Sequence, residues 1–123
     1  MRRRIADQDN VVILNYTPHA IVFFGSEGLD AVRIKPEKTP IRVEEIRETS
    51  DHIMIDNHRV PINTKSFGEV VGLPDKKEGV YLIVSMVVAE AARHRDDLLF
   101  PDKVVRDEHG VIVGCDALAK VVV

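Results

Sequence analysis

Hydrophobic and polar positions divide this chain into short apolar stretches separated by turn residues. The clearest stretch is Tyr81–Val84, a β-prone run bounded by Gly79. It is too short for an independent helix and is typical of a central strand with both faces covered. We therefore expect the rest of the fold to be organised around this strand.

From Ser85 onward the pattern changes to that of a helix. The apolar positions recur at helical spacing on one stripe, at Val84, Val87, Val88 and Ala91. This spacing predicts one substantial helix from about residue 85 to residue 95, with Ser85 as its N-cap. The N-terminus of a helix also attracts anions, although a plain cap is the simpler interpretation.

Other apolar runs predict short strands joined by tight turns. Val11–Tyr16 and Ala20–Gly25 flank Thr17–His19, where a proline favours a hairpin connection. A second hairpin is expected around Asp56-Asn57, and a third around Asp107–Gly110, where Asp and Gly occupy favourable turn positions.

These elements together predict an α+β fold that is mainly β. We expect one antiparallel, hairpin-rich curved sheet or partial barrel, packed on the single helix. Residues 41–47 alternate only weakly, and a helix over Val43–Thr49 fits nearly as well. Residues 1–10 are expected to form a flexible polar tail, and residues 11–123 a single globular domain.

The composition of the chain excludes several classes of function. The 123 residues carry a net charge of −3, which argues against general binding to nucleic acids or anionic membranes. No apolar run approaches the roughly 20 residues of a membrane helix. The single cysteine, Cys115, excludes an internal disulfide and fits a reducing compartment, so we expect a cytoplasmic protein.

Basic residues at two places are candidate anion ligands. Arg93 and Arg95 lie at the end of the predicted helix, where cations also complement the helix dipole and pair with nearby acids. Arg106 precedes Asp107 at a hairpin mouth, and its guanidinium group would suit a phosphate or carboxylate. Asp107 has an alternative role in the turn itself.

A third polar cluster lies at the first predicted turn. Asn15, Thr17 and His19 offer hydrogen bonds that either satisfy the backbone of the turn or, if the turn lies near Ser85, bind a ligand. The candidate ligand-binding residues are therefore Asn15, Thr17, His19, Ser85, Arg93, Arg95, Arg106 and Asp107.

Catalysis has weaker support. His52, Asp56 and His58 share one region, but their spacing matches no familiar metal signature. Cys115 would need a positioned base, and His109 lies in an exposed turn. Because the phosphate-binding, dinucleotide-binding and nucleophile-elbow motifs are also absent, we assign no catalytic residue, metal ligand or cofactor.

Several short motifs follow one another along the chain, and together they resemble the sequence pattern of a family of small prokaryotic and phage proteins for which no activity is established. The motifs are Asn15-Tyr16-Thr17-Pro18-His19, Gly68-Glu69 through Gly72-Leu73-Pro74, Tyr81–Ser85 with Val88-Ala89, Arg95-Asp96-Asp97-Leu98, Pro101, Val105-Arg106-Asp107 and Gly114-Cys115. The resemblance covers most of the chain except the first ten residues and residues 28–51. It implies no catalytic roles, and it directs attention to the polar residues within the motifs.

The sequence therefore predicts a non-catalytic module that binds a small anionic ligand, nucleotide-like or phosphate-like, near Ser85 and the arginines. Two alternatives remain open. One is a structural or regulatory protein that forms a homo-oligomer or binds a partner chain through free strand edges. The other is a small hydrolase that depends on a metal or on Cys115. Many short strands with one covering helix also predict at least a dimer.

Overall fold

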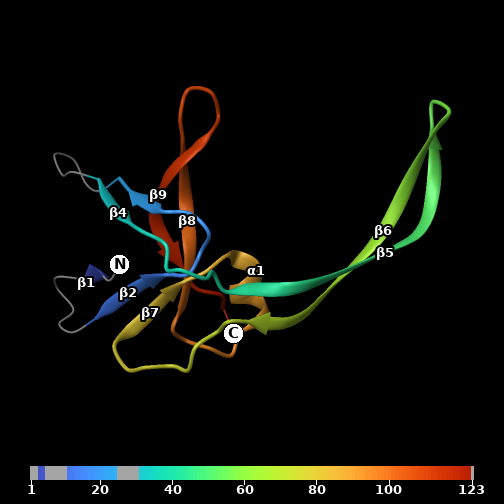
Figure 1. The fold of residues 1–123 in the computed structure, drawn as a ribbon. Coiled ribbons are helices and arrows are strands. Elements are labelled where there is room, and N and C mark those ends of the chain that lie inside the picture. The colour runs from blue at the N-terminus through green and yellow to red at the C-terminus, as the bar shows by residue number, and fades with distance from the viewer. Residues whose placement is uncertain (1–2, 5–10, 25–30, 123) are drawn as a thin grey trace.

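The structure, a computed structural model, describes residues 3–4, 11–24 and 31–122 (Figure 1). Within these residues, seven strands form one sheet in the spatial order β1-β2-β7-β8-β9-β3-β4, and two form a separate sheet. The elements are β1 (Arg3–Arg4), β2 (Val12–Asn15), β3 (Ile21–Phe23), β4 (Val32–Ile34), β5 (Arg42–Ile55), β6 (His58–Val71), β7 (Val80–Ile83), α1 (Met86–Ala91), β8 (Leu98–Arg106) and β9 (Ile112–Ala119). The expected class, α+β and mainly β, is confirmed.

Strand β7 lies between β2 and β8 and pairs in parallel with both. Its Leu82 side chain belongs to one buried cluster and its Ile83 side chain to another. Both faces of the strand are therefore covered, as its unbroken apolar run predicts.

The larger sheet is mixed rather than purely antiparallel, and this corrects one detail of the expected fold. Strands β2 and β3 do not form the expected hairpin, because β2 pairs with β7 whereas β3 pairs with β4 and β9. The chain leaves β2 at Tyr16, whose N–H donates to the Ile83 carbonyl at 2.8 Å. The Asn15 side chain then holds the following loop, and the chain re-enters the sheet at another position.

Helix α1 begins as expected and ends earlier. The Ser85 hydroxyl accepts a hydrogen bond from the Val88 N–H at 3.2 Å, so Ser85 is the N-cap. The helix spans Met86–Ala91 rather than about 85–95, with Ala92 as its C-cap. Ala92 is fully buried, and the chain must turn there to bring Leu98 into β8 beside β7.

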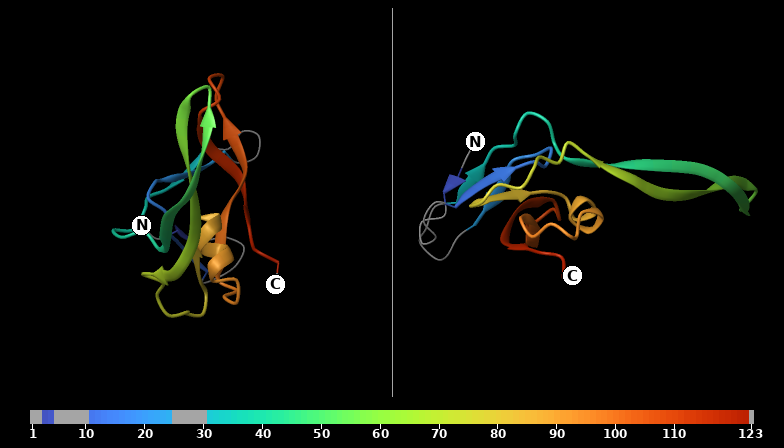
Figure 2. Two further views of the ribbon diagram at one scale, coloured as in Figure 1. Left: turned by 90° about the vertical axis from the view of Figure 1, so that its right-hand side faces the viewer. Right: turned by 90° about the horizontal axis from the view of Figure 1, so that it is seen from below.

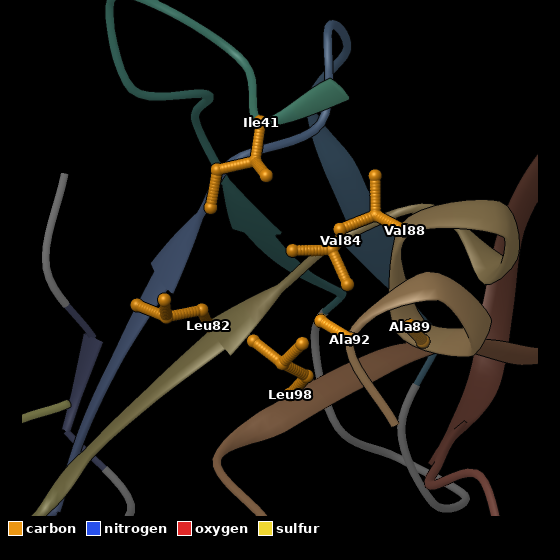
Figure 3. Close-up of a cluster of buried hydrophobic side chains, with 7 residues drawn as sticks. All are labelled: Ile41, Leu82, Val84, Val88, Ala89, Ala92 and Leu98. Atoms are coloured by element: carbon orange, nitrogen blue, oxygen red, sulfur yellow. The ribbon is translucent and has the colours of Figure 1, made fainter. Parts of the chain in front are cut away.

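Two hydrophobic clusters fill the body, by which we mean the larger sheet together with α1. One cluster, shown in Figure 3, packs α1 against β7 and the start of β8; its members are Ile41, Leu82, Val84, Val88, Ala89, Ala92 and Leu98. The other, formed by Ile13, Ile34 and Ile83, has side chains of β3 and β9 packed against it. The cluster that contains Ile83 is therefore covered by other strands of the curved sheet, whereas the cluster that contains Leu82 is covered by α1.

The two remaining predicted hairpins are confirmed. Asp56 and Asn57 both have positive φ angles, 46° and 67°, as a two-residue type I′ turn requires. The hairpin around them is much longer than expected, because β5 and β6 each contain 14 residues. The alternative helix over residues 43–49 is wrong, since these residues belong to β5.

The β5–β6 hairpin, called the arm below, extends away from the body, whereas the β8–β9 hairpin is shorter (Figure 1). The right-hand view of Figure 2, seen from below, also shows the arm extending away from the body. At a rise of about 3.4 Å per residue, 14 residues give the arm a length of about 45 Å. Of the expected polar tail, only the backbone of Arg3–Arg4 is described, paired with β2, and the remainder lies outside the described residues.

Candidate functional site

The far half of the arm carries an apolar face. Ile53 pairs directly with Val60 across the two strands, and Ile55 and Ile62 lie two residues away on either side. Because side chains alternate along a strand, these four residues share one face. We call Ile53, Ile55, Val60 and Ile62 the distal patch. The exposed fractions of Ile53, Ile55 and Ile62 are 47%, 50% and 40%.

The edges of the arm are less suited to binding than its faces. Pro61 in β6 has no N–H to donate, and proline in a strand is found at edges that do not extend a sheet. The pairing register shifts between Thr49 and Asp51, which twists the outer edge of β5. Near the base, Glu45 forms ion pairs with Arg47 and Lys65. These features oppose pairing with another strand and leave the faces open.

A second apolar surface lies where the arm meets the helix. We call this surface the α1 hollow; it is lined by Phe67, Gly68, Met86, Val87, Glu90 and Ala91. The exposed fractions of Phe67, Met86 and Val87 are 56%, 59% and 45%. The hollow therefore combines an aromatic ring from β6 with two exposed aliphatic side chains of α1.

Among the residues identified from sequence, Asn15 and Thr17 form a buried network. Asn15 Nδ2 donates to the His19 and Ile34 carbonyls at 2.8 and 3.0 Å. Asn15 Oδ1 accepts from the Thr17 N–H at 2.9 Å. The Thr17 hydroxyl lies 2.7 Å from Asn15 Oδ1 and 2.9 Å from the His19 carbonyl, and its one hydrogen serves one of them at a time. This network satisfies the backbone of the loop after β2.

Thr17 and Ser85 line the same hollow, which the base of the arm and the start of α1 enclose. Arg42 and Lys65 contribute cationic side chains to this hollow, and Glu45 contributes a carboxylate. The turn after β2 and the start of the helix therefore do lie together. His19 does not line this hollow.

Arg93 and Arg95 line a different hollow beyond the end of α1, together with His94 and Lys120. We call it the basic hollow. Arg95 donates two hydrogen bonds to the buried Asp97 carboxylate, at 2.8 and 2.7 Å. This pairing raises the pKa of Arg95 above its ordinary value. The guanidinium group of Arg95 thus holds the loop between α1 and β8.

The other cations of the basic hollow are more exposed. Arg93 lies 3.4 Å from Glu90, and both side chains are more than half exposed. Lys120 Nζ lies 5.5 Å from the centre of the Tyr81 ring, within range of a cation–π contact. Sequence reasoning missed Lys120 because it comes from the segment after β9, far from the arginines along the chain.

Arg106 and Asp107 lie at the turn of the β8–β9 hairpin. Asp107 Oδ1 accepts from the N–H groups of His109 and Val111 at 2.8 and 3.0 Å. Arg106 donates to the Gly110 carbonyl at 2.9 Å. Both side chains thus bond within their own turn, and neither lines the basic hollow.

The structure also locates the groups considered for catalysis. Cys115 is buried, and removal from water raises the pKa of its thiol. Among the described residues, no three His, Cys, Asp or Glu side chains gather closely enough to hold a metal ion. In the same part of the chain, no helix is both long and apolar enough to cross a bilayer.

In comparisons with protein families, curated proteins and solved structures, nothing matches this chain.

Proposed function

We propose that this protein is a structural module that assembles with further copies of itself through its arm. The observation that carries the proposal is the distal patch, in which three isoleucines are two-fifths to one-half exposed at the end of a long hairpin. An isolated two-stranded hairpin is marginally stable in water. An arm of this length is therefore better explained as half of an interface than as a free element.

The size of the exposed apolar surface sets the strength of the contact. Full burial of one large aliphatic side chain contributes about 1.5–3 kcal/mol, so half-exposed side chains retain about 1 kcal/mol each. Four residues of the distal patch would supply about 3–6 kcal/mol. Association costs about 4–15 kcal/mol in lost freedom of motion. The patch alone gives only a weak contact, so stable assembly needs a second apolar surface or several contacts per copy.

An experiment on the whole chain tests this proposal. Sedimentation of the 13.8 kDa chain is expected to show masses that increase with concentration to a multiple of the monomer. A variant with residues 49–63 replaced by Asn-Gly, between the paired Glu48 and Thr64, would keep a two-residue turn and lose the patch. We expect this variant to be a monomer with an unchanged melting temperature of the body.

Asn63→Asp is the matched control, because it adds a charge to the arm on the face opposite the distal patch. Its side-chain oxygen can still accept from the Thr49 hydroxyl. The proposal fails if the unmodified chain stays monomeric at millimolar concentration. It also fails if the shortened variant assembles as well as the full chain.

A second candidate function is the binding of a small anion in the basic hollow, the nucleotide-like or phosphate-like ligand expected from sequence. Support comes from the convergence of Arg93, His94 and Lys120 on one hollow of a chain with net charge −3. Titration calorimetry with phosphate, ADP and citrate is the direct test. Binding should be lost in Lys120→Gln and kept in Lys38→Gln, which removes an equal charge outside the hollow. Equal losses would mean that only the overall charge matters.

A further inference from the structure

We propose that the assembly is head to tail, with the arm tip of one copy seated in the α1 hollow of the next. This inference rests on the proposed self-assembly and adds the surface that receives the arm. The hollow supplies the second apolar surface, through Phe67, Met86 and Val87.

The length of the arm excludes a contact between the two surfaces of one copy. The distal patch and the α1 hollow lie at opposite ends of the arm, since Phe67 and Gly68 belong to its base. The arm spans about 45 Å, whereas a domain of about 100 residues has a radius of gyration of about 13 Å. Figure 2 shows the arm extended away from the helix. Only another copy can therefore bring a tip to this hollow.

The chemistry of the two surfaces is complementary. The isoleucines of the distal patch match the exposed aliphatic side chains of Met86 and Val87 on α1. Arg59 pairs with Met54, so it lies on the face of the tip opposite the patch. Glu44 lies beside Gly68, one of the residues that line the hollow: a Cβ at Gly68 would be 2.6 Å from Glu44 Oε1.

A charge beside the hollow also fits a seated tip. Within the described part of the chain, neither Arg59 nor Glu44 has an ion-pair partner. A tip lying between the helix and the arm base would place its patch against α1 and its Arg59 toward Glu44. Both unpaired charges would then acquire a partner of opposite sign.

This arrangement also covers both surfaces on every copy. Pairing of two distal patches about a two-fold axis would leave the α1 hollow open on each chain. A head-to-tail contact uses two different surfaces and therefore builds a closed ring or an open filament. In a ring, each copy makes two contacts, which compensates for the weakness of one.

Two variants that each damage one surface provide the test. Ile53→Asp places a charge in the distal patch, and Val87→Asp places one in the hollow. An acidic residue in the first turn of α1 favours the helix dipole, so Val87→Asp is not expected to unfold the helix. Val122→Asp, at a side chain that is 87% exposed and lies outside the hollow, is the matched control.

Each variant alone is expected to be monomeric, while the control assembles like the unmodified chain. An equimolar mixture of the two variants has one intact patch and one intact hollow between them, so it should form heterodimers and nothing larger. If the unmodified chain assembles but this mixture stays monomeric, or if Val87→Asp assembles normally, the head-to-tail inference is wrong while self-assembly stands. If the unmodified chain is monomeric, both proposals fail.

Cysteine cross-linking provides a second measurement that does not depend on charge. Ile53→Cys in one chain and Val87→Cys in another should form a disulfide heterodimer under mild oxidation. The native Cys115 is buried and its thiol pKa is raised, so it should not compete. A chain with Val122→Cys in place of Val87→Cys should give no specific cross-link. Equal yields from both pairs would overturn the inference.

Discussion

The strands of the body and the strands of the arm differ in the interactions that hold them in place. In the body, Ile83 is fully buried between neighbouring strands, and the buried Asn15 side chain bonds to three backbone groups. No buried side-chain nitrogen or oxygen in the described residues lacks a hydrogen-bond partner. The arm has 28 strand residues, 14 in each strand, and every one of them is at least partly exposed.

The difference shows that a strand can be specified by two distinct sources of free energy. Burial of apolar surface stabilises β7, whereas cross-strand contacts such as Ile53 with Val60 stabilise the arm. Each cross-strand pair contributes only about 0.2–1 kcal/mol. The arm is consequently the part of the molecule whose stability depends most on what binds to it.

The largest expected effect compares one isoleucine from each region. Ile83→Ala should lower the free energy of unfolding by about 2–5 kcal/mol, because it leaves a cavity in a packed core. Ile53→Ala, measured where the protein is monomeric, should lower it by no more than about 1 kcal/mol, the contribution of one cross-strand pair. Urea denaturation of both variants checks this. Similar losses would mean that the arm tip packs against its own body.

A smaller effect is expected in the polar part of the body. Asn15→Ala would leave the Thr17 N–H and the Ile34 carbonyl without their partner, and the expected loss is about 2–4 kcal/mol. Thr17→Val keeps the Asn15 side chain and the Thr17 N–H in place, so the expected loss is about 1 kcal/mol. Thermal unfolding measures both. A larger loss for Thr17→Val would show that the hydroxyl, not the amide, organises this loop.

The smallest effect concerns the base of the arm. The hydrogen bond and charge of Lys65, followed by those of Arg47, hold the pKa of Glu45 below its ordinary value of 4.5. This ion pair therefore contributes stability above pH 4.5 and loses it as the pH falls through the lowered pKa. Lys65→Gln should raise the Glu45 pKa toward 4.5, as measured by a carboxyl NMR titration, whereas Lys38→Gln should not. An unchanged value in Lys65→Gln would show that the pair is not formed in solution.

Local patterns were sufficient for several elements of the fold. The apolar run Tyr81–Val84 predicts a strand covered on both faces, and the structure buries Leu82 and Ile83 in two clusters. The local pattern also predicts Ser85 as the N-cap and turns at Asp56-Asn57 and Asp107–Gly110, and the structure contains all three. These features depend on neighbours within a few residues, which is why the sequence specifies them.

The candidate site was predictable only in part. Arg93 and Arg95 do line one hollow, and Thr17 and Ser85 line another, but Lys120 joins the first from a distant segment. The α1 hollow combines Phe67 of β6 with Met86 and Val87 of α1, and no local pattern connects them. Because such surfaces form between elements, their composition depends on how the elements pack.

By itself the sequence determined that a covered strand forms around Tyr81–Ile83, where the helix starts and where two tight turns fall, since backbone preferences and capping are local. The tertiary structure decided that β2 pairs with β7 rather than with β3, and that the helix ends at Ala91. It also decided whether the alternating apolar residues around Ile53 are buried or exposed. Alternation looks the same in a half-buried strand and in an exposed one. Only the absence of a packed layer against the far half of the arm, within the described residues, leaves those isoleucines available for another chain.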